Sequence, residues 1–125
     1  MFIRPWAGLA GLQPPSGIDG VDGSAYIAGK SAKAPRDRAL LQMMYGYVAW
    51  PGRRALRTHE HSYARTVDGP SFLYIITQDP FQVKNLVEDS GARALLADMD
   101  KRLSTLMNET GDSWEYKATT GDYEQ

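Results

Sequence analysis

The 125-residue sequence contains no cysteine and only two histidines. Without cysteine there is no disulfide framework, no thiolate metal site and no thiol nucleophile, although the compartment stays open because exported proteins can also lack cysteine. Neither charge sign dominates, since 14 lysines and arginines face 15 aspartates and glutamates, for a net charge of -1. This balance gives no indication of a nucleic-acid partner.

Long hydrophobic runs are also absent. No apolar stretch approaches the roughly 20 residues that a bilayer-spanning helix needs, so no membrane segment is predicted. Residues 1–12 are apolar, but Pro5, Trp6 and Gly8 interrupt them after a single arginine, which is not typical of a signal peptide. The localisation stays unknown, and the length and composition are those of about one globular domain.

Residues 1–37 are predicted to be mostly irregular, because glycine and proline punctuate them throughout. A turn or two of helix is expected after Pro5, and one helical turn at 24–28 with Ser24 as its cap. A loop of this length is uncommon inside a compact domain. We therefore expect the natural packing surface of this segment to lie elsewhere.

Four short strands are predicted between residues 38 and 76. Apolar and β-favouring residues occupy 38–47, 53–58, 60–67 and 72–76, and glycine–proline turn signals separate several of these runs. The run that begins at Arg38 could be helix or strand by periodicity alone, and strand is preferred because the following residues favour β structure. Short spacing and tight connections imply an antiparallel meander.

The clearest predicted element is an amphipathic helix. Apolar residues recur at helical spacing from Ala92 to Met107, Asp89 or Ser90 can cap the start, and Gly111 suits a left-handed C-terminal position. Before it, Asp79 is expected to cap a helical turn that begins with Pro80. The predicted fold is α+β: a four-stranded antiparallel sheet with a C-terminal amphipathic helix packed on one face and a long irregular N-terminal segment. The domains are 1–37, 38–112 and a polar tail, 113–125.

Few residues offer chemistry. His59 and His61 would share one face of a strand, a spacing that can hold zinc or copper, but two histidines supply only two ligands, so a polar strand end is the preferred interpretation. No nucleophile has a matched base, so no catalytic residue and no metal ligand is predicted. The candidate substrate-cleft or interface contacts are Tyr45, Tyr47, Trp50, His59 and His61.

Four arginines could bind an anionic ligand, but acidic residues close in sequence offer ordinary surface pairing. The arginines are Arg53, Arg54, Arg57 and Arg65, and the acids are Glu60, Asp68 and Asp79. Taken alone, the residues indicate a binding or scaffolding module.

Four short motifs in order resemble the C-terminal segment of type I sulfatases, in the alkaline-phosphatase-like superfamily. The first motif is Leu9-Ala10-Gly11-Leu12, followed by Pro14 or Pro15, Gly17, Asp19-Gly20 and Asp22, and the second is Arg54-Ala55-Leu56-Arg57-Thr58. The third combines Leu73-Tyr74, Asp79-Pro80-Phe81 and Asn85-Leu86, and the fourth is Glu109-Thr110-Gly111-Asp112. The resemblance implies a small α+β subdomain. It also implies that the family's formylglycine, calcium ligands and catalytic Lys and His belong to a larger domain upstream, so that no cofactor is expected in this chain.

The resemblance supports two hypotheses about function. The first is a sulfatase C-terminal subdomain that is inactive alone and packs against the catalytic domain as its partner, where the loop from Tyr45 to Trp50 helps to wall the substrate cleft. The second is a non-enzymatic binding or assembly module, which forms a homo-oligomer through the interdomain surface that the catalytic domain would otherwise cover. Two departures from the family, Ser62 and Ile75, suggest that a cross-strand ion pair has been replaced.

Overall fold

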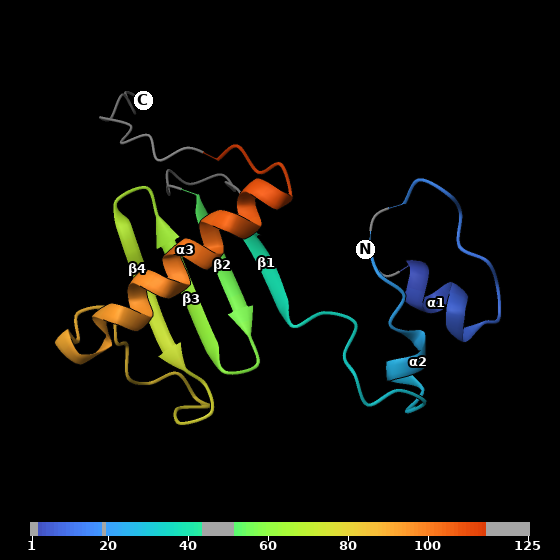
Figure 1. The fold of residues 1–125 in the computed structure, drawn as a ribbon, viewed down its shortest axis with the longest axis horizontal. Coiled ribbons are helices and arrows are strands. Elements are labelled where there is room, and N and C mark those ends of the chain that lie inside the picture. The colour runs from blue at the N-terminus through green and yellow to red at the C-terminus, as the bar shows by residue number, and fades with distance from the viewer. Residues whose placement is uncertain (1–2, 19, 44–51, 115–125) are drawn as a thin grey trace, which may run out of the picture. The chain divides into compact units, whose positions relative to one another are not determined.

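The computed structural model describes residues 3–18, 20–43 and 52–114 (Figure 1). By their contacts the residues divide into two compact units, Met1–Asp37 and Arg38–Gln125. The first unit holds two short helices, and the second holds a sheet and a long helix.

The first unit contains α1 (Ile3–Leu9) and α2 (Ser24–Ile27), and neither helix has a buried residue. Gly8 lets the two helices approach closely, since a Cβ at Gly8 would lie 2.4 Å from the Ser24 hydroxyl oxygen. Polar contacts supplement this packing, and the Nη2 of Arg4 donates to the carbonyl of Ile18 at 2.8 Å. In its described residues, 3–18 and 20–37, the unit therefore has helices but no buried apolar cluster.

The capping prediction for α2 is wrong. The helical turn is present, but its N-cap residue is Gly23 and no side chain caps it, while the Ser24 amide donates to the Asp22 carboxylate at 2.8 Å. This hydrogen bond and one to the Ser24 side chain lower the pKa of Asp22. An aspartate two residues before a free amide is the ordinary Asx-turn geometry.

The second unit confirms the predicted meander. Its antiparallel strands are β1 (Arg38–Met43), β2 (Arg53–Thr58), β3 (His61–Thr66) and β4 (Gly69–Ile75), and they follow one another in that order across the sheet. Residues 44–47 of the first predicted strand lie outside the described residues. The turn predicted at 67–70 is shorter than expected, because Gly69 and Pro70 already pair with β3. A bulge accompanies Pro70, which an edge strand tolerates.

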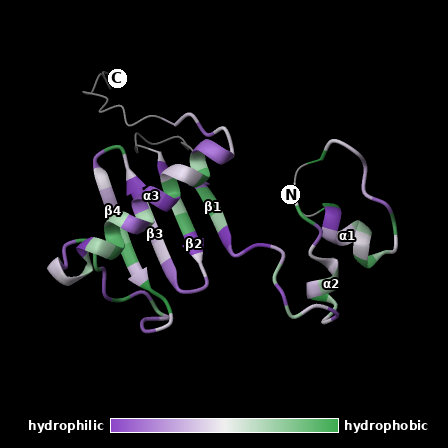
Figure 2. Ribbon diagram, viewed as in Figure 1, coloured by the Kyte–Doolittle hydropathy of each residue, from purple (hydrophilic) through white to green (hydrophobic). Residues whose placement is uncertain are grey.

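Strand pairing fixes which side chains share a face of the sheet. Tyr63 pairs with both Leu56 and Leu73, and its hydroxyl donates to Asp100 of α3 (Arg93–Glu109), so this set faces the helix. Successive residues of a strand project from opposite faces of the sheet, and Figure 2 shows that the strands carry both hydrophobic and hydrophilic residues. The neighbours of the helix-facing residues therefore project from the opposite face.

The register contradicts the hypothesis of a replaced ion pair. Ser62 pairs with Tyr74, whereas Ile75 pairs with His61. Because directly paired residues share a face and successive residues alternate, Ser62 and Ile75 project from opposite faces of the sheet. Side chains at these two positions cannot form a cross-strand ion pair.

The core lies between the sheet and α3, which crosses one face of the sheet in Figure 1. The buried residues of the core are Leu56, Tyr63, Leu73, Met99, Leu103 and Met107. Burial of such side chains contributes about 1.5–3 kcal/mol each before conformational entropy is subtracted. Asp89 accepts a hydrogen bond from the Gly91 amide ahead of α3, and Gly111 follows it at φ 67°, as predicted.

The segment between β4 and α3 differs from its prediction. Asp79 does cap the chain, accepting from the amides of Val83 at 3.0 Å and Lys84 at 2.8 Å, but the residues after Pro80 form turns and not a helix. Gln82 lies in these turns at a left-handed φ of 54°, which interrupts a right-handed helix.

Candidate functional site

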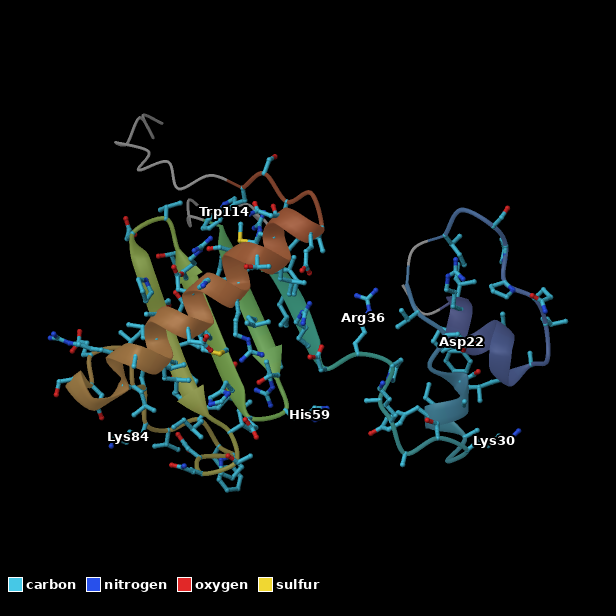
Figure 3. All side chains as sticks on the ribbon, in the orientation of Figure 1. Asp22, Lys30, Arg36, His59, Lys84 and Trp114 are labelled. Carbon is cyan, nitrogen blue, oxygen red and sulfur yellow. The ribbon has the colours of Figure 1, made fainter. Side chains whose placement is uncertain are left out.

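The predicted contact residues fall into two groups. Tyr45, Tyr47 and Trp50 lie outside the described residues, so their role stays a prediction. His59 is exposed in the turn between β2 and β3 (Figure 3). His61 is the first residue of β3, and its Nδ1 lies 4.0 Å from a carboxylate oxygen of Glu60.

The two histidines do not lie together on one strand, because His59 belongs to the turn. The Thr58 hydroxyl oxygen accepts from the amides of Glu60 at 3.3 Å and His61 at 2.9 Å and shapes that turn. Within the described ranges, no group of three or more His, Cys, Asp or Glu residues could hold a metal ion. The pattern gives this end of the sheet a polar turn.

At the other end of the sheet, Asp112 ties the end of α3 to β2. It accepts from Nε of Arg54 at 2.5 Å and from Nη2 at 3.1 Å, and from the Gln42 amide at 2.8 Å. The Arg54 and Asp112 side chains are only 9% and 7% exposed. The Arg54 guanidinium also lies 4.9 Å from the ring centroid of Trp114, labelled in Figure 3. Such a paired, stacked arginine is a structural clamp.

The clamp makes stability depend on acid pH. The hydrogen bond from Arg54 is the main cause that lowers the pKa of Asp112 from 3.8 to about 2. Because the folded pKa is depressed, the contribution is complete above the unfolded value and is lost as pH falls from about 4 through 2. We expect a loss of about 2 kcal/mol over this range, measured by urea unfolding. Asp112→Asn should flatten this part of the profile, and an unchanged slope would contradict the assignment.

A second polar cluster lies beneath the middle of α3. Asp100 accepts from the Tyr63 hydroxyl at 2.7 Å and from Nη1 of Arg65 at 2.8 Å, and Arg65 also donates to the Ser104 hydroxyl at 2.9 Å. The Arg65 side chain is 12% exposed. This network fixes the rotation of α3 on the sheet, because three hydrogen bonds from Tyr63 and Arg65 converge on one helix face.

These contacts correct the prediction that the arginines pair with acids nearby in sequence. Arg54 pairs with Asp112 and Arg65 with Asp100, so the acids come from α3 and the residues just after it. No local sequence signal joins residues 58 and 35 positions apart. The relevant signal is compositional, since the four strands contain no aspartate or glutamate.

Asn85 fastens the turn segment to β4. Its Oδ1 accepts from the amides of Leu73 at 3.0 Å and Val87 at 3.2 Å, while its Nδ2 donates to the Ser71 carbonyl at 3.1 Å. The amide of Leu86 adds a bond to the Leu73 carbonyl at 2.9 Å. Asn85 and Leu86 of the motif therefore attach the turn segment to the edge strand β4 by hydrogen bonds.

Replacement of Asn85 should locally destabilise the turn segment between β4 and α3. Asn85→Ala removes three side-chain hydrogen bonds at a solvent-exposed site, so we expect a loss of about 1–2 kcal/mol of stability and faster amide exchange at Leu73. Asn108→Ala, at an exposed position of α3, is the matched control and should change neither quantity. Equal effects of the two substitutions would contradict the role of Asn85.

The grooves of the second unit are lined by mixed charges. One of about 450 Å³ lies between the edge of β4 and the start of α3, and its lining includes Glu88, Asp89, Arg93 and Asp100. The described residues place no nucleophile with a base in it. What the structure offers is thus a set of structural clamps and exposed surfaces. Among the described residues, no helix has both the length and the apolarity needed to cross a bilayer.

Comparison with known proteins identifies the origin of this fold. The chain is 31% identical over 110 residues to an ulvan-active sulfatase of Formosa agariphila, and the match covers 86% of the chain. The chain is a homologue of a C-terminal part of a sulfatase. It spans 22% of the length of that relative. The resemblance predicted from the four motifs is confirmed, although no protein-family model matches.

Parts of several solved structures share the fold of this chain. A candidate sulfatase from Bacteroides thetaiotaomicron superposes with a TM-score of 0.78 at 19% identity, over 94% of this chain and 26% of its own. A protein solved with its substrate D-glucosamine-2-N,6-O-disulfate gives 0.70 at 17%, over 92% and 24%. The phosphonate monoester hydrolase of Agrobacterium radiobacter gives 0.62 at 18%, over 85% and 24%. In each case this sulfatase homologue corresponds to about a quarter of a longer chain.

Proposed function

We propose that this chain is the C-terminal structural subdomain of a sulfatase, which packs against the catalytic portion and does not hydrolyse sulfate esters by itself. The observation that carries the proposal is the surface of the first unit. α1 and α2 bury no residue, and large apolar side chains such as Trp6, 69% exposed, and Leu12, 66% exposed, face outward. Apolar exposure of this kind is typical of a surface that packs against another protein.

The lengths of the relatives indicate which protein is the partner. The ulvan-active sulfatase matched in sequence is several times longer than this chain, and so are the proteins of the matched structures. The remaining three quarters of such a protein are large enough to hold both the catalytic groups and a surface that covers the apolar side chains. We infer that this portion is the partner.

The residues present do not fit the family's cofactors. Formylglycine is expected at a Cys-x-Pro-Ser-Arg motif, and this sequence has no cysteine. Among the described residues no cluster of three acidic or histidine side chains forms a calcium or other metal site. We therefore assign both groups to the catalytic portion and derive no chemical step in this chain.

Co-expression tests the proposal. The full chain would be expressed with the ulvan-active sulfatase of Formosa agariphila from which the matched C-terminal part has been deleted. We expect the two proteins to purify together in a 1:1 complex. If the chain instead purifies as a discrete homo-oligomer that ignores this partner, the self-associating binding module is the better account.

An activity assay tests the negative part of the proposal. The purified chain should not hydrolyse a generic aryl sulfate above the rate of buffer alone, because the part of the chain that the structure describes offers no nucleophile paired with a base. The intact Formosa sulfatase, assayed beside it, controls for the substrate. Turnover that follows the chain through purification would show that it is catalytic.

A further inference from the structure

The face of the sheet opposite α3 has no covering element among the described residues of the second unit. We call it the open face and define it by Leu41, Met43, Arg53, Arg57, Phe72 and Tyr74, which alternate away from the helix-facing residues. Leu41 and Met43 are 51% and 59% exposed. The face is therefore apolar along the β1 edge, where a partner's apolar side chains would be buried.

The other half of the open face is aromatic and cationic. Phe72 and Tyr74 have ring centroids 5.4 Å apart, and Arg53 of β2 reaches across β3 to place its guanidinium 5.6 Å from the Phe72 centroid. Arg57 lies on the same face and pairs in register with Ser62. Apolar, aromatic and arginine side chains together are typical of protein interfaces.

The face of the sheet that α3 covers shows which groups pair with the arginines of this sheet. The four strands contain five arginines and no acid. On the helix face, acids of α3 and its C-terminal end pair with the arginines: Arg38 with Glu109, Arg54 with Asp112, and Arg65 with Asp100. On the open face, the described residues provide no ion pair for Arg53 or Arg57. The covered face thus combines contact with α3 and carboxylate partners, whereas the described residues provide the open face with neither a covering element nor a carboxylate for Arg53 and Arg57.

We propose that the open face docks on the remaining portion of a sulfatase, and that the docking surface presents apolar side chains to Leu41 and Met43 and carboxylates to Arg53 and Arg57. This inference rests on the proposed function and names the surface that serves it. The matched relatives contain the additional chain that such a docking surface needs.

A second copy of this chain is a poorer occupant. A two-fold interface would bring the open face of one copy against the same face of the other. Arg53 and Arg57 would then find no carboxylate on the strands of the second copy, since the strands that form the face contain no acid. Like charges in a desolvated interface oppose association, whereas a different protein can supply the complementary sign. The exposed aliphatic side chains also favour a protein over an anionic polysaccharide.

Variants of the full chain test the docking surface in the co-expressed complex with the truncated Formosa sulfatase. Leu41→Glu should weaken binding at least about thirtyfold, and Arg57→Glu about tenfold, with a larger effect at low salt. The matched controls are Val83→Glu, at an apolar residue 83% exposed on the turn segment, and Lys101→Glu, on the exposed side of α3. Both controls should bind within about threefold of the unchanged chain, and circular dichroism melting verifies that all variants fold.

The outcomes separate the two proposals. If the unchanged chain does not bind the truncated sulfatase, the proposed function fails and the docking surface fails with it. If the unchanged chain binds, and Leu41→Glu and Arg57→Glu bind as well as the controls, only the docking surface is wrong. A homodimer that Leu41→Glu dissociates, or a sulfated polysaccharide that competes with the partner and needs Arg57, would assign the open face to another occupant and overturn the inference.

Discussion

Replacement of Asp112 by alanine should lower the free energy of unfolding by about 3–5 kcal/mol. The substitution leaves the guanidinium of Arg54 in place, 9% exposed and without the two carboxylate oxygens that accept its hydrogen bonds. Removing one partner of a buried ion pair is strongly destabilising because the remaining charge is uncompensated. The carboxylate also accepts from Gln42 of β1 and from the Trp114 amide, so the end of α3 loses its attachment to two strands.

Glu109→Ala is the matched control for this prediction. Glu109 pairs with Arg38 at 3.3 Å, but both side chains are well exposed, so its removal should cost less than about 0.5 kcal/mol. Guanidinium or urea unfolding of both variants measures the difference. A loss below about 1 kcal/mol in Asp112→Ala would show that Arg54 is hydrated in solution and that the clamp does not hold the helix.

The second large effect is expected at Leu103. Leu103 is fully buried and packs in the core between α3 and the sheet with Leu56, Tyr63 and Leu73. Leu103→Ala should destabilise the fold by about 2–5 kcal/mol, because the change removes buried methyl groups and leaves a cavity. The same change at Leu41, which is 51% exposed on the open face, should stay within about 0.5 kcal/mol.

Urea unfolding of Leu103→Ala and Leu41→Ala measures the two losses of stability. The difference between them distinguishes the face of the sheet that α3 covers from the open face. If Leu41→Ala were as destabilising as Leu103→Ala, and more so at high protein concentration, the open face would be buried in a self-assembly.

The sequence predicted the second unit well because its signals are local. The strand predicted at 53–58 matches β2 as observed, and apolar spacing from Ala92 to Met107 locates α3. Gly111 ends the helix in a left-handed conformation that only glycine adopts without strain. Each of these features depends on residues within a few positions of one another.

The clamps could not be predicted because they join distant segments. Nothing near Arg54 in sequence indicates Asp112, 58 positions away, and nothing near Tyr63 indicates Asp100, 37 positions away. The helical turn after Asp79 failed for a related reason. Asn85 and Leu86 bond to β4 instead, and that tertiary pairing overrides the local preference for helix.

The motif from Leu73 to Leu86 holds the fold by hydrogen bonds between its side chains and the backbone, and Phe81 within it is 87% exposed. The spacing that produced the resemblance therefore has a structural explanation within this chain. The homology of the chain to a sulfatase is consistent with a structural role of this motif. The side chains of Asp79 and Asn85 form hydrogen bonds that hold the turn segment.

Sedimentation velocity is the most direct test of the account, because it measures the full chain alone and mixed with the truncated Formosa sulfatase. The account predicts a monomer when the chain is alone and a 1:1 complex in the mixture, which Leu41→Glu dissociates and Val83→Glu leaves intact. A stable homo-oligomer of the chain that persists in the mixture, with no heterocomplex, would contradict it.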